Sequence, residues 1–214
     1  MLMRRYAQCR MIGLLCLCAC GIIPGAAAGP VHVDATGGDD RNDGASPGRA
    51  WSSLQRVCQA DLKPGDRVLF KRGETWRGQL IPKSGRESAP VTYGAYGQGA
   101  KPRLLGSVSR SEPADWQREG PRLWVTAKEP LRQDVGNIIF GHGKSAGVKR
   151  WKKADLKQPG DYWYNAGTGQ VTLCAERNPG DLWQSIELAL NRHIISENNA
   201  SYVVYEGLAQ KYGA

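Results

Sequence analysis

The chain has 214 residues, which is enough for one sizeable domain with a hydrophobic core. Its formal net charge of +9 suits acidic polysaccharide, anionic lipid headgroups or nucleic acid, and charge alone does not choose among them. The sequence contains no recognition helix, zinc-ligand spacing or aromatic RNA-binding motif, which argues against nucleic acid as a partner. Four of the six cysteines lie within the first 20 residues, so a disulfide framework is excluded.

The first 28 residues have the pattern of a secretion signal. Arginines at the start form a cationic end, the run from Met11 to Ile23 carries no charge, and the small residues Ala26 to Ala28 follow. The apolar run is shorter than the roughly 20 residues of a membrane span and is interrupted by glycine. We therefore expect cleavage after Ala28, no transmembrane segment in the mature chain, and a location that is secreted, periplasmic or on the cell surface of a bacterium.

A second interpretation applies to the same segment. Leu17-Cys18-Ala19-Cys20 resembles the lipobox of bacterial lipoproteins, which would place a lipid anchor at Cys20. Either process exports the chain. Cleavage after Ala28 removes three arginines from the formal charge of +9, which leaves +6. It also leaves Cys58 and Cys174, which permit at most one disulfide.

Residues 29–65 are predicted to form a loop followed by a short helix. The stretch from Asp34 to Gly48 is rich in Gly, Asp and Asn, and its spacing does not fit an EF-hand, so turns are favoured over a calcium site. Apolar residues then recur at helical intervals from Trp51 to Leu62. Pro64-Gly65 is expected to end this helix.

Residues 66–106 change to short extended runs separated by glycine turns. These runs are Arg67 to Phe70, Gln79 to Pro82, Val91 to Tyr93 and Arg103 to Leu105. Their centres are about a dozen residues apart with no helical pattern between them, which predicts a mainly β structure. A sandwich, a barrel and a solenoid all fit this spacing.

Residues 107–184 are rich in tryptophan and proline and are interpreted as an inserted element. Within it, Asp161 to Tyr164 and Gln170 to Cys174 flank a turn at Asn165 to Gly169, which predicts a β-hairpin. Strand-like runs return in residues 185–214. These are Ser185 to Leu190, His193 to Ser196 and Tyr202 to Tyr205.

Four segments resemble the N-terminal part of right-handed parallel β-helix proteins of the pectate-lyase-like superfamily. They are VHVDATGGDDRNDGASPGRAWSSLQRV (Val31 to Val57), PGDRVLFKRGETWRGQLIPKSG (Pro64 to Gly85), PVTYGAYGQGAKP (Pro90 to Pro102) and RHIISENNASYVVYEGLAQKYGA (Arg192 to Ala214). The resemblance implies the start of a parallel β-helix, with a short N-terminal capping helix and an inserted β-hairpin element. Members of the family continue for more coils, so we expect a truncated member.

The resemblance also implies a function in polysaccharide processing, as an acidic-glycan lyase or a glycoside hydrolase. Family catalytic groups lie in coils beyond this chain, and the three mature histidines form no spaced metal set, so no catalytic residue is assigned. Calcium is implied by the resemblance alone. The alternative is a non-catalytic extracellular module that binds glycan or serves as a surface scaffold. Trp76 between Arg72 and Arg77 would suit an anionic saccharide, and these three are the candidate substrate-binding residues.

Overall fold

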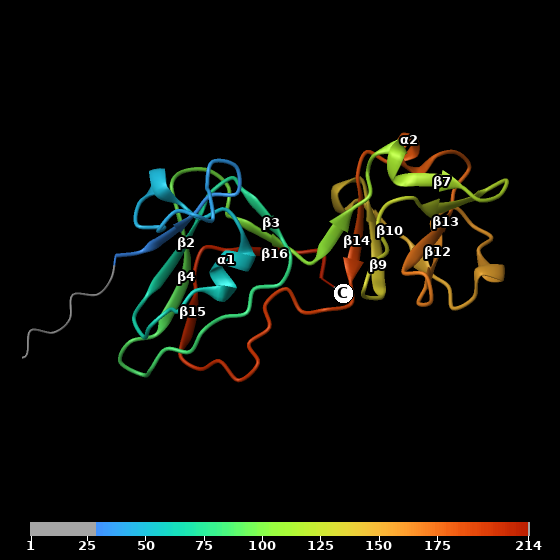
Figure 1. Cartoon of the computed structure of the whole chain (residues 1–214). Coiled ribbons are helices and arrows are strands. Elements are labelled where there is room, and N and C mark those ends of the chain that lie inside the picture. Colours follow the sequence, from blue (N-terminus) through green and yellow to red (C-terminus); the bar gives the residue numbers. More distant parts are fainter. Residues whose placement is uncertain (1–28, 214) are drawn as a thin grey trace, which may run out of the picture.

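The computed structural model describes residues 29–213, which form two lobes (Figure 1). Each lobe has its own cluster of buried apolar side chains. The signal-peptide and Cys20 lipid-anchor predictions fall outside the described residues. Within residues 29–213, no helix is long and apolar enough to cross a membrane.

The first lobe contains two parallel sheets. One has the strand order β1-β2-β4-β15 and the other the order β16-β5-β3. The strands are β1 (Val31–Val33), β2 (Arg67–Lys71), β3 (Thr75–Arg77), β4 (Val91–Tyr96), β5 (Arg103–Leu105), β15 (Val203–Tyr205) and β16 (Ala209–Lys211). The runs predicted at Gln79 to Pro82 and His193 to Ser196 form only an isolated bridge, between Leu80 and Ile195.

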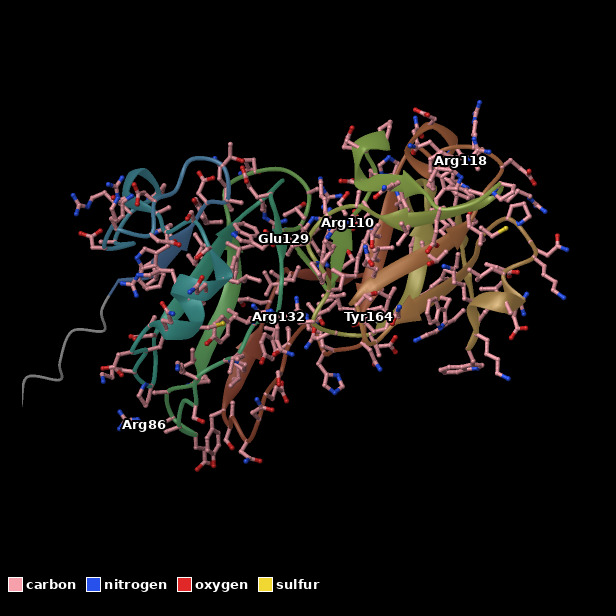
Figure 2. The ribbon with its side chains drawn as sticks, turned by 45° about the vertical axis from the view of Figure 1, so that its right-hand side comes forward. Arg86, Arg110, Arg118, Glu129, Arg132 and Tyr164 are labelled. Carbon is pink, nitrogen blue, oxygen red and sulfur yellow. The ribbon has the colours of Figure 1, made fainter. Side chains whose placement is uncertain are left out.

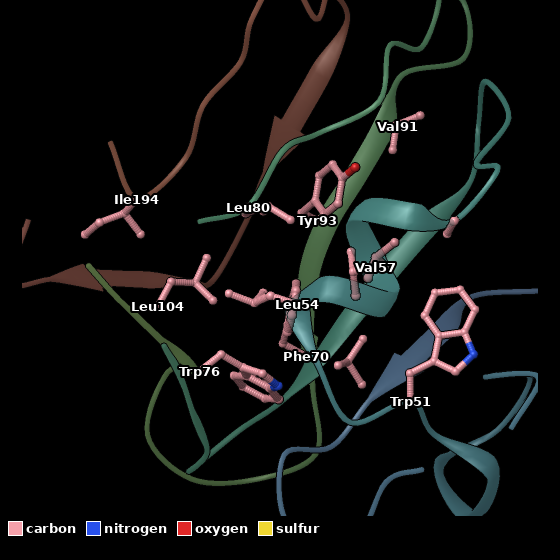
Figure 3. Close-up of a cluster of buried hydrophobic side chains, with 13 residues drawn as sticks. Trp51, Leu54, Val57, Phe70, Trp76, Leu80, Val91, Tyr93, Leu104 and Ile194 are labelled. Atoms are coloured by element: carbon pink, nitrogen blue, oxygen red, sulfur yellow. The ribbon is translucent and has the colours of Figure 1, made fainter. Parts of the chain in front are cut away.

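The predicted helix is present as α1 (Leu54–Gln59) and is shorter than its apolar pattern. Its first residue is set by Ser53, whose side chain accepts a hydrogen bond from the backbone N–H of Arg56 at 3.1 Å. Leu54 and Val57 are buried and face the strands of the first lobe (Figure 3). The helix therefore closes one side of this core.

The first core gathers residues that lie far apart in the sequence (Figure 3). Phe70 from β2 and Trp76 from β3 meet edge to face, with ring centroids 5.0 Å apart. Tyr93 from β4 is fully buried, and its hydroxyl accepts a hydrogen bond from the backbone N–H of Lys83. Leu104 and Ile194 complete the far side of the cluster.

The second lobe is built mainly from antiparallel pairs. One sheet has the order β10-β9-β14-β6, and the other has the order β11-β12-β13-β8-β7 with a single parallel pair, β11 with β12. The elements are β6 (Ser107–Ser109), β7 (Trp116–Arg118), β8 (Leu123–Thr126), β9 (Val135–Phe140), β10 (Ser145–Ala146), β11 (Val148–Lys149), β12 (Asp161–Asn165), β13 (Gln170–Cys174), α2 (Pro179–Leu182) and β14 (Ile186–Leu190).

The predicted hairpin is confirmed as β12 and β13. The two strands pair antiparallel, with Asn165 opposite Gln170 and Tyr162 opposite Leu173. Gly169 closes the turn at a φ of 69°, a left-handed conformation that favours glycine.

The predicted right-handed parallel β-helix is wrong, and so is the resemblance to the pectate-lyase-like superfamily. The described residues form four separate sheets of mixed direction and no solenoid. Parallel pairing dominates only in the first lobe, and the strands between β6 and β14 pair almost entirely antiparallel. Short strands about a dozen residues apart arise in both kinds of sheet, so their spacing could not distinguish them.

Cys58 and Cys174, the two cysteines of the described residues 29–213, are free thiols. Cys58 packs against the first core, whereas Cys174 is buried in the second lobe at the end of β13. No disulfide therefore links them in this structure.

Candidate functional site

A pocket of about 630 Å³ lies where the two lobes meet, and we call it the interlobe pocket. The first lobe supplies residues of the sheet β16-β5-β3 and the start of α1. The second lobe supplies Glu187 from β14 and His142 from the loop after β9. The walls of the pocket thus come from both lobes.

Trp76 contributes to one wall of the pocket but is almost entirely covered. Its side chain is 4% exposed and packs on Phe70, and the indole N–H donates to the backbone carbonyl of Ser52 at 2.9 Å. The ring is thereby fixed in the first core.

Arg77 joins the two lobes across the pocket. Its guanidinium donates to both carboxylate oxygens of Glu187, at 2.5 and 2.7 Å. Ser107 Oγ donates to the same carboxylate at 2.7 Å. Glu187 is buried, so this two-pronged pair is shielded from water on the carboxylate side and fixes the position of Arg77.

Two further cations line the pocket, Arg103 from β5 and Lys211 from β16. Arg103 stands opposite Thr75 in the parallel register and donates to its hydroxyl at 3.0 Å. Among the described residues, neither Arg103 nor Lys211 forms an ion pair. Since Glu187 balances Arg77, the pocket carries an excess of two positive charges.

His142 and Tyr212 also line the pocket, and both have a left-handed backbone, with φ values of 60° and 57°. Such a conformation is unfavourable for a residue with a side chain and is held by surrounding contacts. The backbone N–H of His142 donates a hydrogen bond to Ser185 Oγ at 2.6 Å. Two acid–base side chains therefore lie beside the excess positive charge.

Arg72 lies elsewhere. It lines a separate pocket of about 220 Å³ with Glu206 and Gly207, and its guanidinium reaches the carbonyl of Gly99 at 3.5 Å. The structure therefore brings Trp76 and Arg77 to one pocket and leaves Arg72 out of it.

Sequence reasoning missed Arg103, Lys211 and Glu187 as pocket residues. The glycines on either side of His142 are the one local signal of its unusual backbone, which has a φ of 60°. Arg103 and Lys211 are brought together only by the pairing of β5 with β16, strands more than a hundred positions apart, and no local pattern records that pairing.

The Asp-rich loop before α1 is used in turns and ion pairs. Asp39 pairs with Arg41, whose hydrogen bonds lower the pKa of Asp39 to about 2. Asp40 accepts hydrogen bonds from the backbone of Ser52 and Ser53. In the part of the chain that the structure describes, no group of three or more His, Cys, Asp or Glu side chains could hold a metal ion.

The sequence matches no protein-family model and no curated protein. Among solved structures, the chain is similar to the complex of XylC with xylose, at 14% identity and a TM-score of 0.66 over 86% of this chain and 35% of that one. It is also similar to a structure described as a glycoside hydrolase, at 11% identity and a TM-score of 0.57 over 87% of this chain and 51% of that one.

At 14% and 11% identity, these two similarities show a shared fold alone. A lacto-N-biosidase of family GH136 from Eubacterium ramulus matches at 33% identity over 43% of this chain and 15% of that one, with a TM-score of only 0.34. The chain spans about a third of the length of the XylC chain, which it covers to 35%.

Proposed function

We propose that this chain is a carbohydrate-binding part of a larger exported protein, and that the interlobe pocket binds a saccharide with an acidic group. The observation that carries this proposal is the pair of cations without carboxylate partners among the described residues, Arg103 and Lys211, in the interlobe pocket. A carboxylate or sulfate on a sugar supplies the missing negative charge. The similar folds of a xylose complex and a glycoside hydrolase support a sugar as the carrier of that charge.

Calorimetric titration of the chain from residue 29 onward with trigalacturonate tests the proposal. The variant Arg103→Gln/Lys211→Gln should bind about a hundredfold more weakly or worse, because it loses two charged hydrogen bonds that contribute roughly 1.5–3 kcal/mol each. Affinity of the unaltered chain should fall with added salt. The matched control is Arg86→Gln/Arg118→Gln, which removes the same charge from exposed positions at opposite ends of the molecule (Figure 2). An equal loss of affinity in both double variants would show that net charge alone causes the effect, and it would contradict binding in the interlobe pocket.

A catalytic version of the same function has one observation in its favour, the presence of His142 and Tyr212 beside the cations. A base placed there can take the C5 proton of a uronate while the cations neutralise its carboxylate. The electron pair of the broken C–H bond forms the C4–C5 double bond as the C4–O bond breaks, and the departing sugar oxygen takes a proton from the other of these two side chains. Incubation with polygalacturonate, followed by absorbance of unsaturated uronates, separates a lyase from a binding module. Activity that persists in His142→Ala and Tyr212→Phe would contradict these assignments.

A further inference from the structure

The second lobe carries another pocket, of about 210 Å³, with an aromatic lining. We call it the aromatic pocket, and its lining includes Asp134, Lys149, Trp151, Trp163 and Tyr164. None of these residues lines the interlobe pocket.

Trp151 is the most notable of these side chains, because it is 82% exposed. It belongs to neither core cluster, and the ammonium of Lys149 lies over its ring, 5.4 Å from the centroid. A tryptophan left in water gains nothing for folding from its large apolar surface. Trp151 is not isolated, because Trp163 and Tyr164 line the same pocket, and an exposed apolar patch rimmed by polar groups is typical of a ligand-binding groove.

The backbone fixes where the aromatic groups lie. Parallel pairing of β11 with β12 sets Lys149 opposite Tyr162, and the N–H of Arg150 donates to the carbonyl of Tyr162 at 2.7 Å. Trp151 is thus the next residue after a backbone segment that is hydrogen-bonded to β12, and it lines the same pocket as Trp163 and Tyr164. The hydroxyl of Tyr164 donates to the carbonyl of Leu131 at 2.9 Å, which anchors that ring on β12 (Figure 2).

The charges at the aromatic pocket cancel. Lys149 donates to both oxygens of Asp134, at 2.7 and 2.6 Å. Arg150 pairs with the buried Asp161 at 2.8 Å. Both cations are thus satisfied by carboxylates of the protein, in contrast to Arg103 and Lys211. An anionic ligand would have to displace one of these carboxylates, whereas a neutral ligand would not.

We propose that the aromatic pocket is a second sugar-binding site, specific for a neutral pyranose unit. The apolar C–H face of the sugar ring packs on the indole of Trp151, whose electron-rich face attracts the slightly positive hydrogens. Sugar hydroxyls donate to Asp134 and accept from Lys149. The volume is below the roughly 300–1,000 Å³ of sites for drug-sized ligands, which suits a single ring of a chain that continues into solvent.

This inference is independent of the proposed function, because the two sites share no residue and call for opposite ligand charge. Xylohexaose and cellohexaose are the neutral probes, added to the chain from residue 29 onward and followed by calorimetry and by saturation-transfer NMR. Trp151→Ala should weaken binding of at least one probe by about fivefold or more. Trp151→Phe, which keeps an aromatic face, should retain most of the affinity. Tyr202→Ala, which removes an aromatic ring that is 54% exposed on the first lobe, should change nothing.

Salt distinguishes the two sites. Affinity for the neutral probes should be unchanged between about 50 and 500 mM salt, and Arg103→Gln/Lys211→Gln should leave it intact. Failure of both hexasaccharides to bind, or binding that Trp151→Ala does not weaken, would overturn the proposal. If sedimentation instead shows that Trp151→Ala abolishes self-association of the chain, the surface is a contact between protein molecules and the sugar site is equally refuted.

Discussion

Asp34, just after β1, shows how one residue ties a loop to a sheet. Its side chain is almost fully buried and forms an ion pair with Lys71 of β2 at 2.7 Å. The backbone N–H groups of Thr36 and Gly37 donate to the same carboxylate. Burial acts to raise the pKa of Asp34, but these hydrogen bonds outweigh it and the pKa lies below its usual value of 3.8.

Replacing this carboxylate should therefore destabilise the fold in a pH-dependent way. Asp34→Asn should lower the free energy of unfolding by about 1–3 kcal/mol at neutral pH. Because the folded pKa of Asp34 is depressed, its contribution is present above the unfolded pKa of about 3.8 and is lost as the pH falls through the folded pKa. Urea unfolding at a series of pH values measures the difference between the two proteins, which should shrink below about pH 4.

Asp61→Asn serves as the control for that experiment. Asp61 pairs with Lys63 at 2.5 Å, but both side chains are exposed, so its loss should have little effect on stability. A difference between wild type and Asp34→Asn that stays constant down to acid pH would contradict the role given to the carboxylate.

At the scale of elements, the hairpin of β12 and β13 depends on its turn. Gly169 has a φ of 69°, and a Cβ atom there would lie 2.6 Å from the carbonyl oxygen of Leu131 and 2.9 Å from Pro130 Cβ. The N–H of Leu131 also donates to the carbonyl of Gly169 at 2.7 Å. The turn is thus pressed against the neighbouring segment.

Gly169→Ala should destabilise the protein by about 2 kcal/mol or more, because the strained backbone and the clash act together. Gly167→Ala in the same turn is the matched control. Gly167 lacks a left-handed φ, and its added Cβ would come no closer than 3.3 Å to Asn165 Oδ1. Thermal unfolding followed by circular dichroism compares the two variants. Equal melting temperatures of the two variants would contradict a contribution of the Gly169 backbone conformation to stability.

Elements with a local signal were predictable from the sequence. Strand β5 has the predicted bounds, and the hairpin is marked by two extended runs around a glycine turn. Strand β3, by contrast, was not predicted, and it contains Arg77, whose guanidinium pairs with Glu187 in the other lobe. Which strands pair, and in which direction, is decided by contacts between distant segments, and the prediction of a parallel solenoid failed at this point.

In the candidate site, too, residues with a local sequence signal were predicted, and residues brought together by long-range pairing were not. Trp76 and Arg77 were identified from their neighbourhood in the sequence, and the structure places both at the interlobe pocket. Their proposed contact with a saccharide stays a prediction. Arg103 and Lys211 come together through strand pairing alone, which one sequence without its relatives does not encode in any local pattern.

At the scale of the whole molecule, the two lobes each contain one thiol. Cys174 is 1% exposed, and burial raises its pKa. Cys58 is partly exposed, and its sulfur lies 3.3 Å from the backbone nitrogen of Ile81. The two thiols thus report on different cores.

Labelling with Ellman's reagent should therefore give two phases in the folded chain from residue 29 onward, which contains only these two cysteines. Cys58 should react first, and Cys174 should react only as the second lobe opens. The single variants Cys58→Ser and Cys174→Ser assign the phases. A mass lower by two hydrogens after air oxidation, with both thiols lost from one monomer, would show a disulfide and contradict the separation of the cysteines.

If the interlobe pocket binds a ligand as proposed, binding and the relative placement of the two lobes are coupled, because both lobes line the pocket. Arg77 and Glu187 already join the two cores at this point, and a ligand held between Arg103 and the opposite wall would oppose their separation. Saturating ligand should therefore raise the melting temperature of the chain and sharpen its unfolding transition. Substitutions that tilt one lobe, even far from the pocket, would then alter affinity without touching the ligand.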